Sequence, residues 1–152
     1  MDGEREVLSK LALQYYDEHL NCAESVSQAT ADYVQKSINM IPLATPFGGG
    51  LGRTGNVCGA VTGALLGLGL VRGRHDAGDA EGYQRVAERA SVFLTEFKDK
   101  FGSLSCGELT GYDLTEEAQH EAFRADPDRR ERCRLLVAGA ADLLQKILVS
   151  GE

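Results

Sequence analysis

The segment of this chain that most restricts its fold is long, apolar and without charge. From Cys58 to Val71 it reads CGAVTGALLGLGLV. It is too short to cross a bilayer, which takes about 20 residues, and a helix that is apolar on every side belongs in the interior of a protein. Gly59, Gly63 and Gly67 recur at every fourth residue and therefore share one face of such a helix. We expect a central, glycine-faced helix whose bare face either lets a neighbouring backbone approach closely or leaves room for a bound group.

The rest of the chain has the periodicity of amphipathic helices, with apolar residues at steps of three and four. Helices are expected over residues 5–20, 22–37, 79–101 and 115–124, and from Asp126-Pro127 onward. No segment alternates as a strand does, and 152 residues, 43% of them hydrophobic, suffice for one core. We predict a single all-α domain over residues 1–152, a bundle of five to six helices around the central glycine-rich apolar helix.

The charge of the chain restricts its partners. It has 16 basic and 23 acidic residues, a net charge of −7. Nucleic-acid binding needs a basic surface, so we expect no nucleic-acid partner. The N-terminal residues MDGEREVLSK contain no apolar run and do not resemble a secretory signal, which favours a cytoplasmic protein with no membrane partner. One basic cluster is interleaved with acids and is interpreted as a solvated helix face: Arg129, Arg130, Arg132 and Arg134.

A glycine-rich loop precedes the apolar segment. Residues 50–55, GLGRTG, match the GxGxxG pattern of dinucleotide-binding loops, and Asp76 follows about 20 residues later. That pattern requires a strand before the loop, whereas Pro42 and Pro46 interrupt the preceding segment, so we reject a dinucleotide site. Two alternatives stay open: the successive N–H groups of the loop bind an anion, or the loop is a turn that leads into the apolar helix.

Four cysteines are the strongest chemical signal in the sequence. They are Cys22, Cys58, Cys106 and Cys133, separated by 36, 48 and 27 residues, so no CxxC or zinc-finger spacing is present. Because cytosolic thiols are kept reduced, metal binding or redox chemistry is favoured over two permanent disulfides. The helical phases turn Cys22 and Cys133 inward, whereas Cys58 and Cys106 stand at breaks in the pattern that resemble helix starts.

The expected positions of the cysteines favour ionised thiols. A helix N-terminus presents unpaired N–H groups and the positive end of the helix dipole, which lowers the pKa of a cysteine. Cys22, Cys58 and Cys106 all lie at expected helix starts, and Arg53 would add positive charge near Cys58. The alternative is that each cysteine is a small buried hydrophobe, which fits Cys22 and Cys133 best. No base for a cysteine nucleophile can be identified from spacing.

The segments around the cysteines resemble a bacterial and archaeal family named as redox-active proteins. Residues 58–63, CGAVTG, match the Cys-Gly-Ala-x-x-Gly element of that family, and residues 47–55 are similar to its glycine-rich approach. Cys22 resembles the cysteine that precedes the element, and Cys106 and Cys133 resemble the two that follow it. The resemblance covers nearly the whole chain, and all four cysteine positions are filled.

The resemblance implies a redox protein that uses Cys22, Cys58, Cys106 and Cys133, and two physical forms stay open. In one form the cysteines are redox thiols that exchange dithiol and disulfide. In the other they ligate a metal or an iron–sulfur cluster that passes electrons. Domains related to this family occur beside cytochrome modules, and the resemblance therefore implies electron transfer. The chain would then be an oxidoreductase or an electron-transfer protein.

Cofactor and partners are less well determined by the sequence. The cofactor is unknown, with an iron–sulfur cluster or zinc as candidates, and Gly55, Gly59 and Gly63 are the candidate cofactor-binding residues. We expect a redox partner of unknown identity, and a homodimer would bury more of the glycine-faced helix. An alternative of a different class is a structural zinc site or a non-catalytic helical interaction module.

Overall fold

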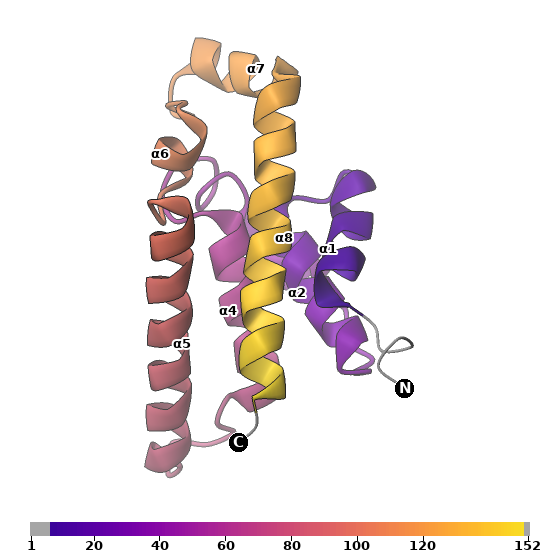
Figure 1. The fold of residues 1–152 in the computed structure, drawn as a ribbon, viewed down its shortest axis with the longest axis vertical. Coiled ribbons are helices and arrows are strands. Elements are labelled where there is room, and N and C mark those ends of the chain that lie inside the picture. Colours follow the sequence, from indigo (N-terminus) through magenta and orange to yellow (C-terminus); the bar gives the residue numbers. More distant parts are fainter. Residues whose placement is uncertain (1–6, 151–152) are drawn as a thin grey trace.

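The fold is a bundle of helices, described by a computed structural model over residues 7–150 (Figure 1). The elements are α1 (Leu8–Asp17), α2 (Cys22–Tyr33), α3 (Ile41–Ala44), the 3₁₀ turn η2 (Thr45–Phe47), α4 (Gly59–Arg72), α5 (Ala80–Phe101), α6 (Cys106–Thr110), α7 (Glu117–Ala125) and α8 (Pro127–Val149). Within the described residues the only β-type pairing is an isolated bridge between Val57 and Ser105. The all-α prediction is confirmed.

Two of the first helices end earlier than the periodicity of the sequence suggests. α1 ends at Asp17 and α2 at Tyr33, whereas the sequence predicts helices as far as residues 20 and 37. The chain leaves these helices through His19 and Gln35, whose φ angles of 73° and 60° are left-handed. Glycine usually marks this position at a helix end, and because neither residue is glycine the sequence carries no stop signal there.

The two longest helices, α5 and α8, lie side by side and antiparallel, as Figure 1 shows. α4 packs against both of them and against α2, while α1 packs against α2 and α8. The interior between them is mostly aliphatic, with Phe93 and Phe97 of α5 as its largest fully buried side chains. No helix within residues 7–150 combines the length and the apolar composition needed to cross a membrane.

The glycines of α4 form its contact with α2. A β-carbon built at Gly63 would lie 2.7 Å from the carbonyl oxygen of Ala23, and one at Gly67 would lie 2.6 Å from Oγ1 of Thr30. Both distances are shorter than real carbon contacts, so only glycine permits this separation of the two helices. Of the two uses that the sequence left open for the bare face, Gly63 and Gly67 therefore serve close helix packing.

A substitution at Gly63 tests this contact. Gly63→Ala should lower the free energy of unfolding by about 1–3 kcal/mol, because overpacking against the α2 backbone outweighs the higher helix propensity of alanine. Gly69→Ala is the matched control on the same helix, since nothing lies within 4 Å of its β-carbon position. It should raise the free energy of unfolding by up to about 1 kcal/mol. Urea denaturation measures both, and equal effects of the two substitutions would contradict the packing argument.

Candidate functional site

All four cysteines line one cavity, which has a volume of about 200 Å³ and which we call the cysteine cavity. Cys58, Cys106 and Cys133 are buried and Cys22 is half-buried, and all four are free thiols. The structure thus brings together residues that are far apart in the sequence. The other lining residues are Tyr16, His19, Leu20, Asn21, Gly49, Gly59, Thr110, Phe123, Arg129, Arg130 and Leu136.

Local capping places Cys22 and Cys106 at helix starts, as the sequence predicts. Asn21 caps α2 with a capping box, in which its side chain accepts a hydrogen bond from the N–H of Glu24 and the Glu24 carboxylate accepts one from the N–H of Asn21. Ser105 caps α6 by accepting a hydrogen bond from the N–H of Glu108. Such caps satisfy N–H groups that a helix start leaves unpaired, so each cysteine is the first residue of its helix.

A short backbone pairing joins Cys58 to the segment that carries Cys106. The N–H of Cys58 donates to the carbonyl of Leu104 at 2.8 Å, and the N–H of Cys106 donates to the carbonyl of Asn56 at 2.6 Å. These bonds flank the bridge between Val57 and Ser105. The residue before α4 and the residue that starts α6 are therefore held at the same wall of the cavity.

The glycine-rich loop packs closely behind Cys106. Gly50 has a left-handed φ of 71°, and a β-carbon there would lie 2.7 Å from Cβ of Cys106. Leu51 and Arg53 also have left-handed φ values, of 67° and 62°. The loop therefore makes a tight left-handed path that glycines favour, and it fixes the position of the Cys106 side chain.

The three candidate cofactor-binding glycines lie in different surroundings. Gly59 lines the cysteine cavity, where its β-carbon position is 3.2 Å from Cβ of Cys22. Gly63 faces the backbone of α2, and Gly55 lies beside Gly107 and is absent from the lining of the cavity. Their role in binding a cofactor stays a prediction from the sequence.

Cys133 is surrounded by hydrogen-bond donors. The thiol of Cys22, the guanidinium of Arg129 and the hydroxyl of Tyr16 all donate to its sulfur. These bonds, led by the one from Cys22, and the positive charge of Arg129 outweigh burial and lower the pKa of Cys133 to about 6. At pH 7 Cys133 is therefore mostly a thiolate, whereas a thiol at the ordinary value of 9.0 is about 1% ionised.

The other three thiols have raised pKa values, which corrects the expectation that helix starts would ionise them. Burial raises the pKa of Cys58 to about 12, although N–H groups of Ala60 and Val61 bond to its sulfur and act in the opposite direction. Burial also raises the pKa of Cys106 to about 11. The hydrogen bond to Cys133, followed by burial, raises the pKa of Cys22 well above 9.0. Loss of hydration thus exceeds the helix-terminus effect in this cavity.

Arg129 is the cation of the site, which corrects its interpretation as part of a solvated face. Its side chain is 8% exposed. Its Nε donates to the carbonyl of Phe123 at 3.0 Å, one terminal nitrogen donates to the Tyr16 hydroxyl at 3.4 Å, and the guanidinium lies 3.8 Å from the centre of the Phe123 ring. Arg129 precedes Cys133 by four residues on α8, so helical spacing is the sequence signal that identifies it. Arg53, the cation expected near Cys58, is exposed.

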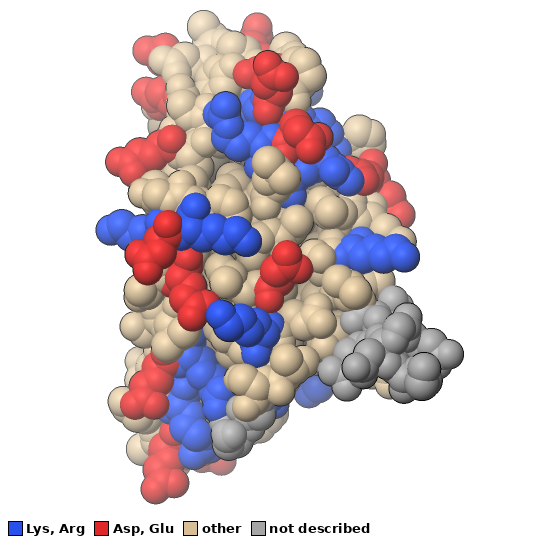
Figure 2. Space-filling model, in the orientation of Figure 1, with Lys and Arg blue, Asp and Glu red and all other residues tan. Residues whose placement is uncertain are grey.

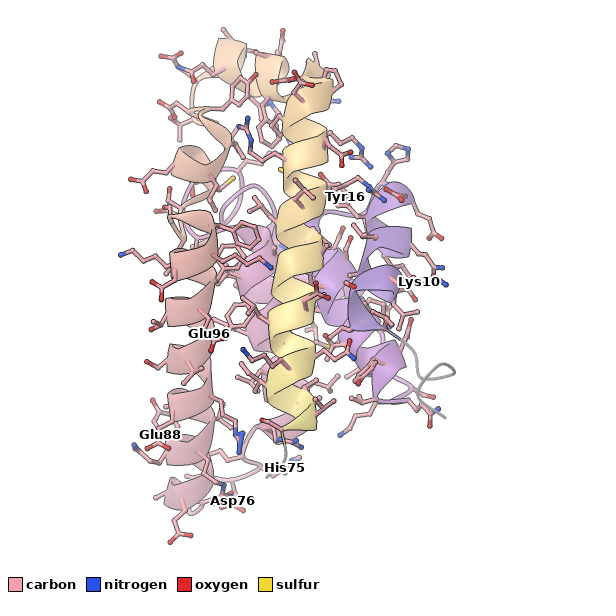
Figure 3. All side chains as sticks on the ribbon, viewed as in Figure 1. Lys10, Tyr16, His75, Asp76, Glu88 and Glu96 are labelled. Carbon is pink, nitrogen blue, oxygen red and sulfur yellow. The ribbon has the colours of Figure 1, made fainter. Side chains whose placement is uncertain are left out.

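Tyr16 completes the surroundings of Cys133 from a different helix. It projects from α1 toward α8 (Figure 3), and its side chain is 3% exposed. Burial, followed by the charges of Cys22 and Cys133, raises the pKa of its hydroxyl, which therefore stays protonated and available as a donor. Nothing in the spacing of the sequence links residue 16 to residue 133, so sequence reasoning missed it.

The geometry also bears on metal binding. Within residues 7–150, no three His, Cys, Asp or Glu side chains are grouped closely enough to hold a metal ion. The four thiols share a cavity, but in this arrangement they do not form the tetrahedral thiolate set that zinc takes. A zinc or iron–sulfur site at Cys22, Cys58, Cys106 and Cys133 therefore stays a prediction from the sequence alone.

Comparison with known proteins identifies the family of the chain. Residues 20–147 match the model of a family described as "Putative redox-active protein (C_GCAxxG_C_C)". The chain belongs to this family. The part that matches the C_GCAxxG_C_C family contains all four cysteines and Arg129, and it begins after Tyr16.

The chain is also similar to a protein of Archaeoglobus fulgidus that carries the name "Uncharacterized protein". The two are 26% identical over 149 residues, an alignment that covers 92% of each chain. No solved structure matches the chain. The likeness at sequence level thus extends over nearly the full length of both proteins.

The ionisation of Cys133 can be measured without a reagent that enters the cavity. In a pH titration, the ultraviolet absorbance of the thiolate should rise with a midpoint near pH 6, because the pKa of Cys133 lies well below the ordinary cysteine value of 9.0. Cys133→Ser should remove this step. Arg129→Met should move the midpoint upward, since it removes the buried charge and a donor while keeping an apolar stem.

Arg132→Met is the matched control for this titration. Arg132 lies on the same helix, is exposed and is absent from the cavity lining. The midpoint near pH 6 should be unchanged in this variant. A low-pH step that survives in Cys133→Ser, or equal shifts in the two arginine variants, would contradict the assignment of the charge to Cys133 and Arg129.

Proposed function

We propose that the protein carries out thiol–disulfide exchange, with Cys133 as the attacking thiolate and Cys22 as the resolving thiol. The observation that carries this proposal is that Cys22 and Cys133 line the same cavity as free thiols, close enough for each to shift the pKa of the other in opposite directions. Exchange requires one ionised sulfur and a second sulfur that can reach it. Cys133 supplies the first and Cys22, the most exposed of the four, supplies the second.

The proposed reaction moves two electrons from the dithiol to a disulfide substrate. The Cys133 thiolate attacks one substrate sulfur, the substrate S–S bond breaks, and the first substrate thiolate leaves. Cys22 then loses its proton to that thiolate or to solvent and attacks Sγ of Cys133. A Cys22–Cys133 disulfide forms, the mixed disulfide breaks, and the second substrate thiolate leaves. The substrate disulfide is reduced to two thiols, and the protein dithiol is oxidised.

The lowered pKa contributes moderately to the rate of the first step. At pH 7, lowering the pKa from 9.0 to about 6 raises the thiolate fraction by about two orders of magnitude. The weaker basicity of such a thiolate lowers its intrinsic reactivity by roughly 15–30-fold over three pKa units. The net gain is about threefold to sixfold. The larger effect of Cys22, Arg129 and Tyr16 is to keep the nucleophile ionised within a buried site.

Cys58 and Cys106 have a different proposed role. Their raised pKa values keep them protonated at pH 7, so neither competes with Cys133 as the attacking sulfur. They lie in the same cavity and can reduce the Cys22–Cys133 disulfide only after losing a proton. An external redox partner is therefore part of the proposal, and a homodimer stays a prediction.

Trapping the mixed disulfide tests the assignment of roles. Reduced protein treated with a stoichiometric small disulfide should yield a Cys22–Cys133 disulfide in peptide mapping by mass spectrometry. Cys22→Ser should instead accumulate a stable mixed disulfide on Cys133, because the resolving sulfur is absent. Cys133→Ser should form neither product.

Cys106→Ser is the matched control, since it removes a thiol from the same cavity without touching the proposed pair. It should still form the Cys22–Cys133 disulfide. Disulfides that map only to other pairs would overturn the assignment. A protein that is isolated anaerobically with metal on all four thiols, and that exchanges no disulfide after the metal is removed, would overturn thiol exchange as its function.

A further inference from the structure

The lining of the cysteine cavity differs in charge from the rest of the molecule. The chain as a whole has a net charge of −7. Among the described residues that line the cavity, two are arginines, Arg129 and Arg130, and none is Asp or Glu. Figure 2 shows Lys and Arg side chains gathered between acidic ones over the upper part of α8. A cavity lined by one sign of charge concentrates ligands of the opposite sign.

Arg130 has a fixed position at this cavity. One of its terminal nitrogens donates to the backbone carbonyl of Tyr16 at 2.9 Å, and its guanidinium lies 4.5 Å from the centre of the Tyr16 ring. The side chain is half-buried. Because one hydrogen bond and one ring contact hold it, the remaining N–H groups of Arg130 can serve as donors to a ligand.

Three acidic groups around this region have partners outside the cavity. Asp17 accepts two hydrogen bonds from Arg134, at 2.8 and 2.9 Å. Asp126 accepts one from the hydroxyl of Tyr112 at 2.6 Å. Glu24 is 8% exposed and bonds to the N–H of Asn21 and to the hydroxyl of Thr45. None of these carboxylates lines the cavity, although Asp17 interacts electrostatically with Arg130 and Asp126 with Arg129 from outside it.

The two arginines of the cavity differ in their partners. Arg129 bonds to Cys133, Tyr16 and Phe123, so its charge is balanced by the thiolate. Arg130 is not among the groups that bond to the Cys133 sulfur. The guanidinium of Arg130 lies at the cavity with N–H groups that can bind a ligand, and the imidazole of His19 lies at the same cavity.

The size of the cavity limits the ligand. A volume of about 200 Å³ is below the roughly 300–1,000 Å³ of sites that enclose drug-sized molecules. Cys133, Cys58 and Cys106 are 4%, 3% and 7% exposed, so the disulfide of a folded protein cannot be brought against Cys133 without displacing the walls. A small molecule fits this space.

We propose that the substrates of this site are small organic disulfides that carry carboxylate or another anionic group, held by Arg130 while Cys133 attacks. This inference rests on the proposed thiol–disulfide exchange. The Cys133 sulfur bonds to one sulfur of the ligand, the ligand S–S bond breaks, and an anionic thiolate leaves. Cys22 then displaces the second anionic thiol as the Cys22–Cys133 disulfide forms, so the ligand gains two electrons and the dithiol loses two.

Three disulfides of similar size and different charge test the inference: dithiodiglycolate as the dianion, 2-hydroxyethyl disulfide as the neutral compound and cystamine as the dication. The readout is the rate at which the reduced protein forms its first mixed disulfide in the Cys22→Ser background. The dianion should react roughly tenfold faster than the neutral disulfide, and the dication more slowly still. The preference should weaken as ionic strength rises.

Arg130→Met should reduce the ratio of the dianion rate to the neutral rate to near one, and Arg130→Lys should retain much of it. A change in the reactivity of the Cys133 thiolate does not alter this ratio, because the same thiolate attacks both disulfides. Arg132→Met, on the same helix but outside the cavity lining, should keep the full ratio. Circular dichroism verifies that each variant is folded.

The outcomes separate the two proposals. If the neutral disulfide reacts at Cys133 but the dianion has no advantage, or if Arg130→Met keeps the ratio, the anionic substrate class is wrong and thiol exchange stands. If none of the three disulfides reacts at Cys133, thiol exchange itself is wrong.

Discussion

The close approach of α2 to α4 is the contact on which the rest of the site depends. Glycine at positions 63 and 67 removes the side chains that would separate the helices, and Gly59 extends the same face to the α4 N-terminus. There the β-carbon position of Gly59 is 3.2 Å from Cβ of Cys22. The spacing that packs the core therefore also sets Cys22 beside the start of α4, where Cys58 lies. The packing of α2 on α4 and the placement of Cys22 beside Cys58 therefore have one structural cause.

Ionisation within the cavity is decided by the loss of hydration on one side and, on the other, by the hydrogen-bond donors and the buried cation around each sulfur. Three thiols lie at helix N-termini, yet burial keeps the pKa values of Cys58 and Cys106 high, and the hydrogen bond to Cys133, followed by burial, raises that of Cys22. Cys133 lies in the middle of α8, without a helix terminus, and it alone has a lowered pKa. A charge-assisted hydrogen bond from a guanidinium is stronger than the partial charge of a helix end. Arg129, one helical turn before Cys133, therefore adds to the effect of Cys22, the largest cause of the lowered pKa.

Short-range signals in the sequence predicted two features: periodicity predicted the helices, and the residue type at position 21 predicted the Asn21 cap. The resemblance to the family implied that the four cysteines act together. The early ends of α1 and α2 were not predictable, since His19 and Gln35 take a conformation that glycine normally marks. Arg129 was misjudged because neighbouring charges suggested a solvated face, although its spacing to Cys133 was visible. Tyr16 reaches the site only through tertiary packing of α1 on α8, for which the sequence has no local signal.

The difference in ionisation among the four thiols also links the two forms of the redox hypothesis, dithiol exchange and metal binding. One thiolate beside Arg129 is a balanced buried charge, whereas a second thiolate in the same cavity would repel it and lose hydration. Four thiolates would need far more positive charge than Arg129 and Arg130 supply, and a metal ion or cluster is the kind of group that supplies it while displacing the protons. Dithiol exchange and metal binding thus correspond to different protonation states of the same cavity. One ionised sulfur beside one protonated sulfur is the state that exchange requires.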